Sequence, residues 1–245
     1  DSTISMHYTN SGIFLISTTN SILTLNSDNI FDKILDIPNQ IQTFFSDEGG
    51  ITVTEQNLIS FSLTGHVIWE KGLHNVSEVT YSNNSLKNYF VNDHKKLICQ
   101  DRNGDELWSY SSEDELEGFA AINSGMMIGL YSNNYFHVLD ENGEQAWSYY
   151  AREKVVDFSF SSFGGDIIVA SDSKIHWFQN EGLLRNQVNI NIGKIQALMS
   201  KILVYESNIG DVEDNFTLVK EQSGGNFISL KNSFTMIVEL RKKLE

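Results

Sequence analysis

Glycine recurs at a constant spacing of 39 residues along the middle of this 245-residue chain. The four glycines are Gly65, Gly104, Gly143 and Gly182. A tryptophan follows four residues after the glycine in three copies, as Trp69, Trp108 and Trp147. An aspartate stands three residues before the glycine in two copies, as Asp101 and Asp140. A fixed period of this length indicates stacked supersecondary units, and these residues are its structural anchors.

Each copy contains four short apolar segments, a to d, which are rich in β-branched and aromatic residues and are separated by turn residues. In the third copy we expect strands at about 77–82, 88–92, 96–100 and 105–111. The corner between c and d is typical of a hairpin turn, in which Asp accepts backbone N–H bonds and Gly supplies a positive φ.

Four strands repeated about every 40–45 residues are typical of a β-propeller blade. We therefore predict an all-β fold, a single β-propeller domain over 1–232 with about six four-stranded blades, and seven as the alternative. The expected blades are about 1–36, 40–74, 76–112, 117–152, 154–190 and 193–231. A β-solenoid fits less well because its coils are shorter, and a pair of sandwiches would not repeat one turn at constant spacing.

The outer copies carry weaker anchors than the middle ones. Asn29 replaces glycine in the first copy, and Lys33, Asn186 and Ile228 stand where tryptophan is expected. The sixth copy also contains a polar insertion. The tail at 233–245 is expected to add a closing strand or to begin a helix.

The c–d corner also resembles a known family. The stretches "DRNGDELW", "DENGEQAW" and "SLTGHVIW" are similar to the repeat of the quinoprotein-type, or PQQ-like, β-propellers, over about residues 30–230. That family includes quinone-dependent dehydrogenases. Those enzymes form longer, eight-bladed rings and use a vicinal cysteine pair and calcium-binding carboxylates. This chain has a single cysteine and about six copies. The resemblance therefore implies a non-catalytic member that uses the blades as a scaffold for protein contacts.

Composition narrows the classes of partner. The net charge is −15, from 17 basic and 32 acidic residues, which is the wrong balance for binding nucleic acid or an anionic membrane. No apolar run reaches the roughly 18–20 residues that span a bilayer, so we expect no direct membrane insertion. Because the sequence opens at an Asp, we leave open whether a leader or anchor has been removed. Both a cytoplasmic and an extracytoplasmic location agree with the composition.

The reactive side chains are better explained by packing than by chemistry. Cys99 lies in an apolar strand context, where a buried and inert thiol is expected. His137 and His176 occupy the same position in adjacent copies, but no third ligand stands at a matching place. We therefore predict no enzymatic activity, no catalytic residue, no cofactor and no metal site.

Acidic connections indicate where a partner could bind. In a propeller the d–a and b–c connections emerge on one face, and two acidic segments, 111–118 and 210–215, are expected there. The candidate interaction face comprises Asn92, Asp93, His94, Glu113, Asp114, Glu115, Asn133, Asn134, Asp172, Asp211, Glu213 and Asp214. Our hypothesis is a non-enzymatic module that binds a protein or peptide through this face. The alternative is a sensor or enzymatic propeller that binds a small molecule or cation near the central channel.

Overall fold

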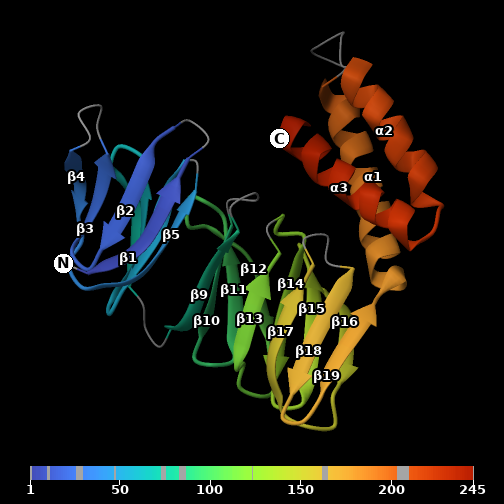
Figure 1. The fold of residues 1–245 in the computed structure, drawn as a ribbon, viewed down its shortest axis with the longest axis horizontal. Helices are drawn as coiled ribbons and strands as arrows, with labels where there is room; N and C mark the ends of the chain where they lie inside the picture. Colours follow the sequence, from blue (N-terminus) through green and yellow to red (C-terminus); the bar gives the residue numbers. More distant parts are fainter. Residues whose placement is uncertain are drawn as a thin grey trace. The chain divides into compact units, whose positions relative to one another are not determined.

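The computed structural model describes residues 2–9, 12–25, 30–46, 48–72, 76–82, 87–122, 124–161, 165–202 and 210–244. The chain divides into two compact units, Asp1–Leu116 and Glu117–Glu245. That they belong to one propeller domain stays a prediction. Five antiparallel sheets follow one another along the chain, and three helices come after the last sheet (Figure 1).

The first unit contains three four-stranded sheets, each of which is an up-and-down meander of consecutive strands. The first sheet comprises β1 (Thr3–Tyr8), β2 (Phe14–Thr18), β3 (Ser21–Leu25) and β4 (Phe31–Asp36). The second comprises β5 (Gln40–Ser46), β6 (Gly49–Thr54), β7 (Asn57–Ser62) and β8 (Val67–Gly72). The third comprises β9 (Val76–Ser82), β10 (Lys87–Asn92), β11 (Lys96–Gln100) and β12 (Glu106–Ser111), close to the strands expected from the third copy.

The second unit contains two sheets and the three helices. The fourth sheet comprises β13 (Gly118–Ala121), β14 (Met127–Ser132), β15 (Tyr135–Asp140) and β16 (Gln145–Tyr150). The fifth sheet has three strands, β17 (Val155–Phe160), β18 (Asp166–Ser171) and β19 (Ile175–Gln179). The helices are α1 (Glu181–Ile202), α2 (Gly210–Ser223) and α3 (Phe227–Leu244). No helix in the described part of the chain is long and apolar enough to cross a membrane.

The repeated corner is a hairpin turn, as the sequence predicts. In the third sheet the carboxylate of Asp101 accepts hydrogen bonds from the backbone N–H of Asn103 at 2.8 Å and of Asp105 at 2.9 Å. Asp140 accepts the same pair of bonds in the fourth sheet. Gly104 has a φ of +83°, in the left-handed region that favours glycine, and Gly65 and Gly143 are alike.

We expect Gly104→Val to lower the free energy of unfolding by about 1–3 kcal/mol, because a β-branched residue is strained at this φ. A Cβ atom added to Gly104 would also lie 3.1 Å from the ring of Trp69. Gly72→Val is the matched control, because Gly72 ends a strand and has open space around it. Urea denaturation of both variants checks this prediction, and equal stability of the two would contradict it.

Neighbouring sheets in the first unit pack face to face. We call the face of a sheet that packs on the following sheet its forward face, and the opposite face its backward face. The forward face of the first sheet, with Leu15 and Ile22, packs against the backward face of the second, with Phe45, Ile59 and Phe61. Along each strand, residues that form this contact alternate with residues that point away from it, as the pleat of a strand requires.

The second and third sheets repeat this arrangement. Ile51 and Leu58 on the forward face of the second sheet form one core with Val79, Phe90 and Ile98 of the third. These apolar side chains are nearly or completely buried. Apolar residues on both faces of the inner strands therefore have a common cause, which is that each sheet is covered on two sides.

Two of the three repeated tryptophans lie at contacts between neighbouring sheets. Trp69 packs on the core between the second and third sheets, and its Nε1–H donates a hydrogen bond to the carbonyl of Arg102 at 2.7 Å. Trp147 of the fourth sheet lies against Phe178 of the fifth, with ring centroids 5.2 Å apart. Trp108 lies against a tyrosine ring of its own sheet. Its packing on the following sheet stays a prediction.

A single hydrophobic core joins the fourth sheet, the fifth sheet and the helices. Phe136 is completely buried, and its ring centroid lies 4.8 Å from that of Phe158 and 6.1 Å from that of Phe160. Gly129 allows this packing, because a Cβ atom there would lie 2.4 Å from the Phe158 ring. The core continues through Leu184 and further apolar residues of the three helices.

The prediction of a sixth blade at 193–231 is wrong. These residues lie in helices, and the tail belongs to α3 and not to a closing strand. The expected fourth strand of the fifth blade is also absent from the described residues, because α1 begins there. Asn180 caps this helix by accepting a hydrogen bond from the N–H of Leu183 at 2.9 Å.

Gly182 is accordingly not a hairpin anchor. It lies in the first turn of α1, where Gln179 stands in the place of the aspartate and Asn186 in the place of the tryptophan. Without these two partners nothing fixes a hairpin at this point. The buried positions that follow have helical spacing instead, and they are Leu183, Leu184, Gln187, Val188, Asn191, Ile195 and Met199.

Candidate interaction face

The candidate face is formed by the d–a and b–c connections, and in the first unit the third sheet brings two of them together. The turn between β10 and β11 contains Asp93 and His94, both exposed and both with left-handed backbone. The carbonyl of His94 accepts a hydrogen bond from the N–H of Leu116 at 2.6 Å. The Nζ of Lys95 donates to the carbonyl of Glu113 at 2.7 Å.

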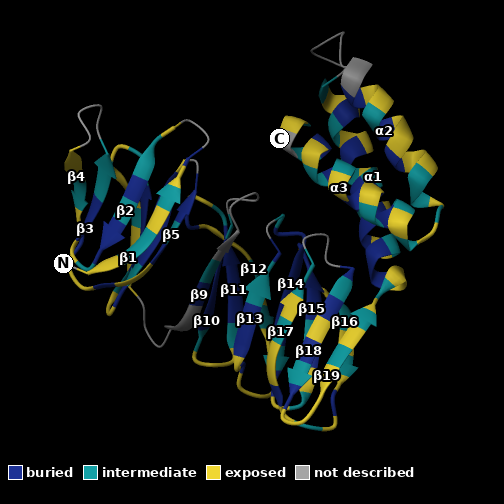
Figure 2. Cartoon of the chain, viewed as in Figure 1, coloured by how far each residue is buried: buried dark blue, intermediate teal, exposed yellow. Residues whose placement is uncertain are grey.

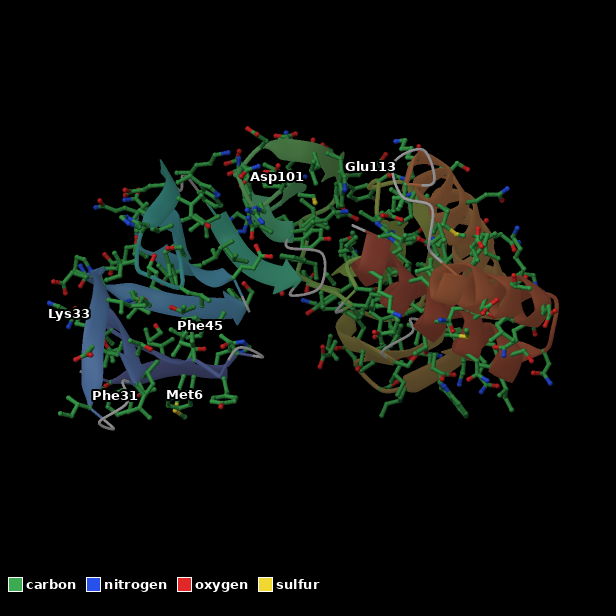
Figure 3. The ribbon with its side chains drawn as sticks, turned by 90° about the horizontal axis from the view of Figure 1, so that it is seen from above. Met6, Phe31, Lys33, Phe45, Asp101 and Glu113 are labelled. Carbon is green, nitrogen blue, oxygen red and sulfur yellow. The ribbon has the colours of Figure 1, made fainter. Side chains whose placement is uncertain are left out.

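The third sheet therefore holds six of the predicted residues on one rim. They are Asn92, Asp93, His94, Glu113, Asp114 and Glu115. The carboxylates of Glu113, Asp114 and Glu115 in the β12–β13 connection are exposed, and so are Asp93 and His94. Figure 3 shows Glu113 on this connection. The resulting surface is polar and carries more acidic than basic side chains.

An open groove lies on the corresponding connections of the first and second sheets. It has a volume of about 390 Å³ and is lined by Asp36–Asn39, Thr54–Asn57, Ile59, Val67 and Glu70. Its charged side chains are all acidic, namely Asp36, Glu55 and Glu70. The amide of Asn57 donates a hydrogen bond to Glu70 at 2.5 Å, while Asp36 is bound by Lys33 at 2.6 Å.

In the second unit the equivalent connections are tied together by hydrogen bonds. The carbonyl of Asn133 accepts from the N–H of Val155 at 2.7 Å, and that of Asn134 accepts from the N–H of Ala151 at 2.9 Å. Asp172 donates its N–H to the carbonyl of a residue in the connection between β16 and β17. Asn133, Asn134 and Asp172 therefore lie on one rim.

Charges on this second rim are largely paired. Glu153 accepts hydrogen bonds from Ser173 at 2.7 Å, from Lys174 at 3.0 Å and from Ser171 at 3.1 Å. These bonds lower the pKa of its carboxyl group to about 2. Nearby, Lys154 forms an ion pair with a carboxylate 2.7 Å away. The second rim thus offers fewer uncompensated charges than the first.

The last three predicted residues do not belong to the face. Asp211, Glu213 and Asp214 lie in helix α2 and not in a connection between strands. Val212 and Phe216, which are buried four residues apart, explain this, because that spacing lets one side of a helix pack on the core. Glu213 and Asp214 are exposed on the helix surface.

Sequence reasoning missed the groove-lining carboxylates. Asp36 lies at the end of a strand, Glu55 lies in a b–c turn, and Glu70 comes from a d strand. The repeat marks the connections that meet on this rim, so the sequence contains a pattern from which Asp36 and Glu55 can be predicted. Glu70 had none, because a strand residue reaches a groove only through the geometry of its neighbours.

The remaining candidates are explained by packing. Cys99 is completely buried, and burial raises the pKa of its thiol to about 12, which suits an inert side chain. His176 lies 3.1 Å from the hydroxyl of Tyr149, and burial lowers the pKa of His137. Within the described ranges no three His, Cys, Asp or Glu side chains are grouped so that they could hold a metal ion.

Comparisons with known proteins bear on the fold. No family model matches the chain, and no curated protein matches it. Among solved structures, Kluyveromyces lactis Hsv2p has 12% sequence identity and a TM-score of 0.49 over 74% of this chain and 75% of that one. KlAtg21, solved in complex with the coiled-coil of AgAtg16, has 10% identity and a TM-score of 0.55. That match covers 68% of this chain, which spans only 63% of KlAtg21. KlAtg21 is a β-propeller protein, and the five antiparallel sheets of this chain are consistent with a fold of that kind.

Proposed function

We propose that this protein is a non-enzymatic interaction module of the PQQ-like β-propeller type, which binds a protein or peptide through its d–a/b–c face. The groove of about 390 Å³ at Asp36, Glu55 and Glu70 carries this proposal. A concave surface with convergent polar groups is the usual form of a binding site. This one is formed where two connections, Ile37–Asn39 and Glu55–Gln56, meet strand residues such as Glu70, and connections carry function because a rigid scaffold positions them.

The charge of the face specifies the kind of partner. All charged residues that line the groove are acidic, and the third sheet adds Glu113, Asp114 and Glu115 to the rim of the same unit. With a net charge of −15, the whole protein attracts cations as well. A basic peptide segment fits both features, because its Lys or Arg side chains gain ionic hydrogen bonds in the groove.

One of the similar structures, that of KlAtg21, supports a role in protein binding. KlAtg21 was solved in complex with a coiled-coil, so a fold of this kind accommodates a protein partner. The PQQ-like assignment has a separate basis, which is the repeated Asp-x-x-Gly-x-x-x-Trp corner. The hairpin geometry of Asp101 and Asp140 gives that motif a structural purpose without any chemistry.

Neutralising the groove tests the proposal. We expect the double variant Glu55→Gln, Glu70→Gln to bind a short lysine-rich peptide about three- to tenfold more weakly, since each exposed charge pair contributes about 0.2–1 kcal/mol. Fluorescence anisotropy of the labelled peptide measures this effect. The loss should shrink as salt is added, because exposed charges are screened.

The control must remove the same charge elsewhere. Asp105→Asn combined with Glu144→Gln changes the net charge equally, but both residues are exposed at c–d turns. This control should bind the peptide as the unmodified protein does. If it weakens binding as much as the groove variant, the peptide senses only the overall charge and the proposed site is wrong.

A further inference from the structure

The first sheet has an apolar face that no described residue of its own unit covers. Its forward face packs on the second sheet through Leu15 and Ile22, so the uncovered one is its backward face. This face carries Met6, Tyr8, Phe14, Ile16, Leu23, Leu25 and Phe31. Figure 3 shows Met6 and Phe31 pointing away from the second sheet, while Phe45 lies between the two sheets.

The fifth sheet presents the opposite kind of face. Its backward face packs on the fourth sheet through Phe158, Phe160 and Phe178. The other side is therefore a forward face, and it carries Ile168 and Trp177, which are paired across neighbouring strands. Ile175 lies on the same side of β19. Ile175 is 78% exposed and Trp177 is 66% exposed, and exposed positions alternate with half-buried ones along β19 (Figure 2).

Equivalent positions in the preceding sheet are covered by a neighbouring sheet. Ile175 and Trp177 stand 39 residues after Phe136 and Val138, which lie on the forward face of the fourth sheet. Phe136 and Val138 are completely buried. The same repeat position is thus apolar in both sheets, but in the fifth sheet no described residue takes the place of a covering sheet.

The first sheet gives the same result for a backward face. Leu25 stands four residues before Asn29, as Phe61 stands four residues before Gly65. Phe61 is 1% exposed because the first sheet covers it, whereas Leu25 is only partly buried. Met6 is 64% exposed and Phe31 is 47% exposed. Large apolar groups concentrated on one face indicate an interaction surface.

We infer that the forward face of the fifth sheet of one molecule binds the backward face of the first sheet of a second copy. The two faces are the two halves of the contact that the chain already makes between its first and second, second and third, and fourth and fifth sheets. A contact between two different surfaces is heterologous, so it builds rings or linear chains of molecules and not a two-fold dimer.

Variants that block one face each test this inference. Phe31→Glu blocks the backward face of the first sheet, and Trp177→Glu blocks the forward face of the fifth. We expect the unmodified protein to form concentration-dependent species larger than a dimer in sedimentation velocity, and each variant alone to lose them. A mixture of the two should form a one-to-one dimer and nothing larger, because one functional pair of faces remains.

Leu218→Glu provides the matched control. Leu218 is 45% exposed on α2, so the substitution adds the same charge without touching either face, and the association should be retained. Higher salt should strengthen association, because like charges on the copies are screened. A protein that stays monomeric at all concentrations would overturn the inference. So would a dimer that Trp177→Glu abolishes and Phe31→Glu leaves intact, because that pattern requires two forward faces to meet.

Discussion

Replacing Glu141 by alanine is expected to lower the free energy of unfolding by about 3–5 kcal/mol, the range found when one partner of a buried ion pair is removed. Glu141 belongs to the c–d turn of the fourth sheet and is 8% exposed. Arg241 of α3 donates to both of its carboxylate oxygens, at 3.0 and 3.1 Å, and Lys194 of α1 lies 2.8 Å away. One carboxylate therefore joins two helices to a strand turn.

The expected loss of stability is large because the partners of Glu141 are themselves largely buried. Arg241 donates a further hydrogen bond to Asn191, whose side chain is completely buried, and Arg241 itself is mostly covered. Alanine at position 141 would leave a guanidinium without its counter-charge in a poorly solvated place. Urea denaturation of the variant and the unmodified protein measures the difference.

This contribution should depend on pH. Burial alone would raise the pKa of Glu141, but its hydrogen bonds and ion pairs with Lys194 and Arg241 outweigh burial and lower the pKa below its ordinary value of 4.5. The folded state therefore binds this proton less readily than the unfolded state. The stability difference between the two proteins should be constant above pH 4.5 and shrink as the pH falls through the lowered pKa.

Glu144→Ala is the control for this prediction. Glu144 lies in the same turn three residues later, but its side chain is exposed, so its loss should change stability by no more than about 0.5 kcal/mol. Equal effects of the two substitutions would show that the carboxylate of Glu141 does not join the helices to the sheet.

The repeat predicts most of the sheet structure because its anchors have a local physical cause. Where Asp, Gly and Trp occur together, as at Asp140, Gly143 and Trp147, the turn, its positive φ and the packing on the next sheet follow from the sequence. Where only Gly182 remains, the period continues in the sequence but the hairpin does not form. A single retained anchor is therefore weak evidence for another blade.

The helices were misread because short apolar runs do not distinguish a strand from a buried helix. The expected sixth blade at 193–231 includes the apolar stretch "IQALM" at 195–199, yet Ile195 and Met199 are buried four residues apart in α1. Asn180 as a helix cap and the spacing of the buried residues were the available signals. The period of 39 residues continues past these signals in the sequence, although Asn186 occupies the tryptophan position.

The candidate face was predictable only in part. The connections that reach one rim follow from the up-and-down order of strands, which placed Asp93, His94 and Glu113 together. The groove depends on how a connection from one sheet approaches a strand of the next, and no local pattern encodes that distance. Glu141 likewise has no local signal in the sequence, because its partners are 53 and 100 residues away along the chain.

Phe136→Ala should destabilise the protein by about 3–5 kcal/mol, as expected for a large aromatic removed from a well-packed core. The ring is completely buried and touches aromatic rings from two sheets, among them Trp147 and Phe158. Gly129 brings the rings of Phe158 and Phe160 close to the backbone of β14, and the cavity left by alanine would lie among them.

Phe136→Leu is the control that distinguishes the loss of side-chain volume from the effect of any substitution at this position. Leucine keeps most of the apolar volume, so its cost should stay below about 1.5 kcal/mol, well under that of alanine. Hydrogen exchange should lose protection in β14, β15 and β17, which surround the ring, while denaturation gives the change in free energy. If alanine costs no more than leucine, the contact between the fourth and fifth sheets does not depend on this ring. The inference that the equivalent position, Ile175, binds a face of a second copy would then lose its basis. Burying a forward face would in that case add no stability.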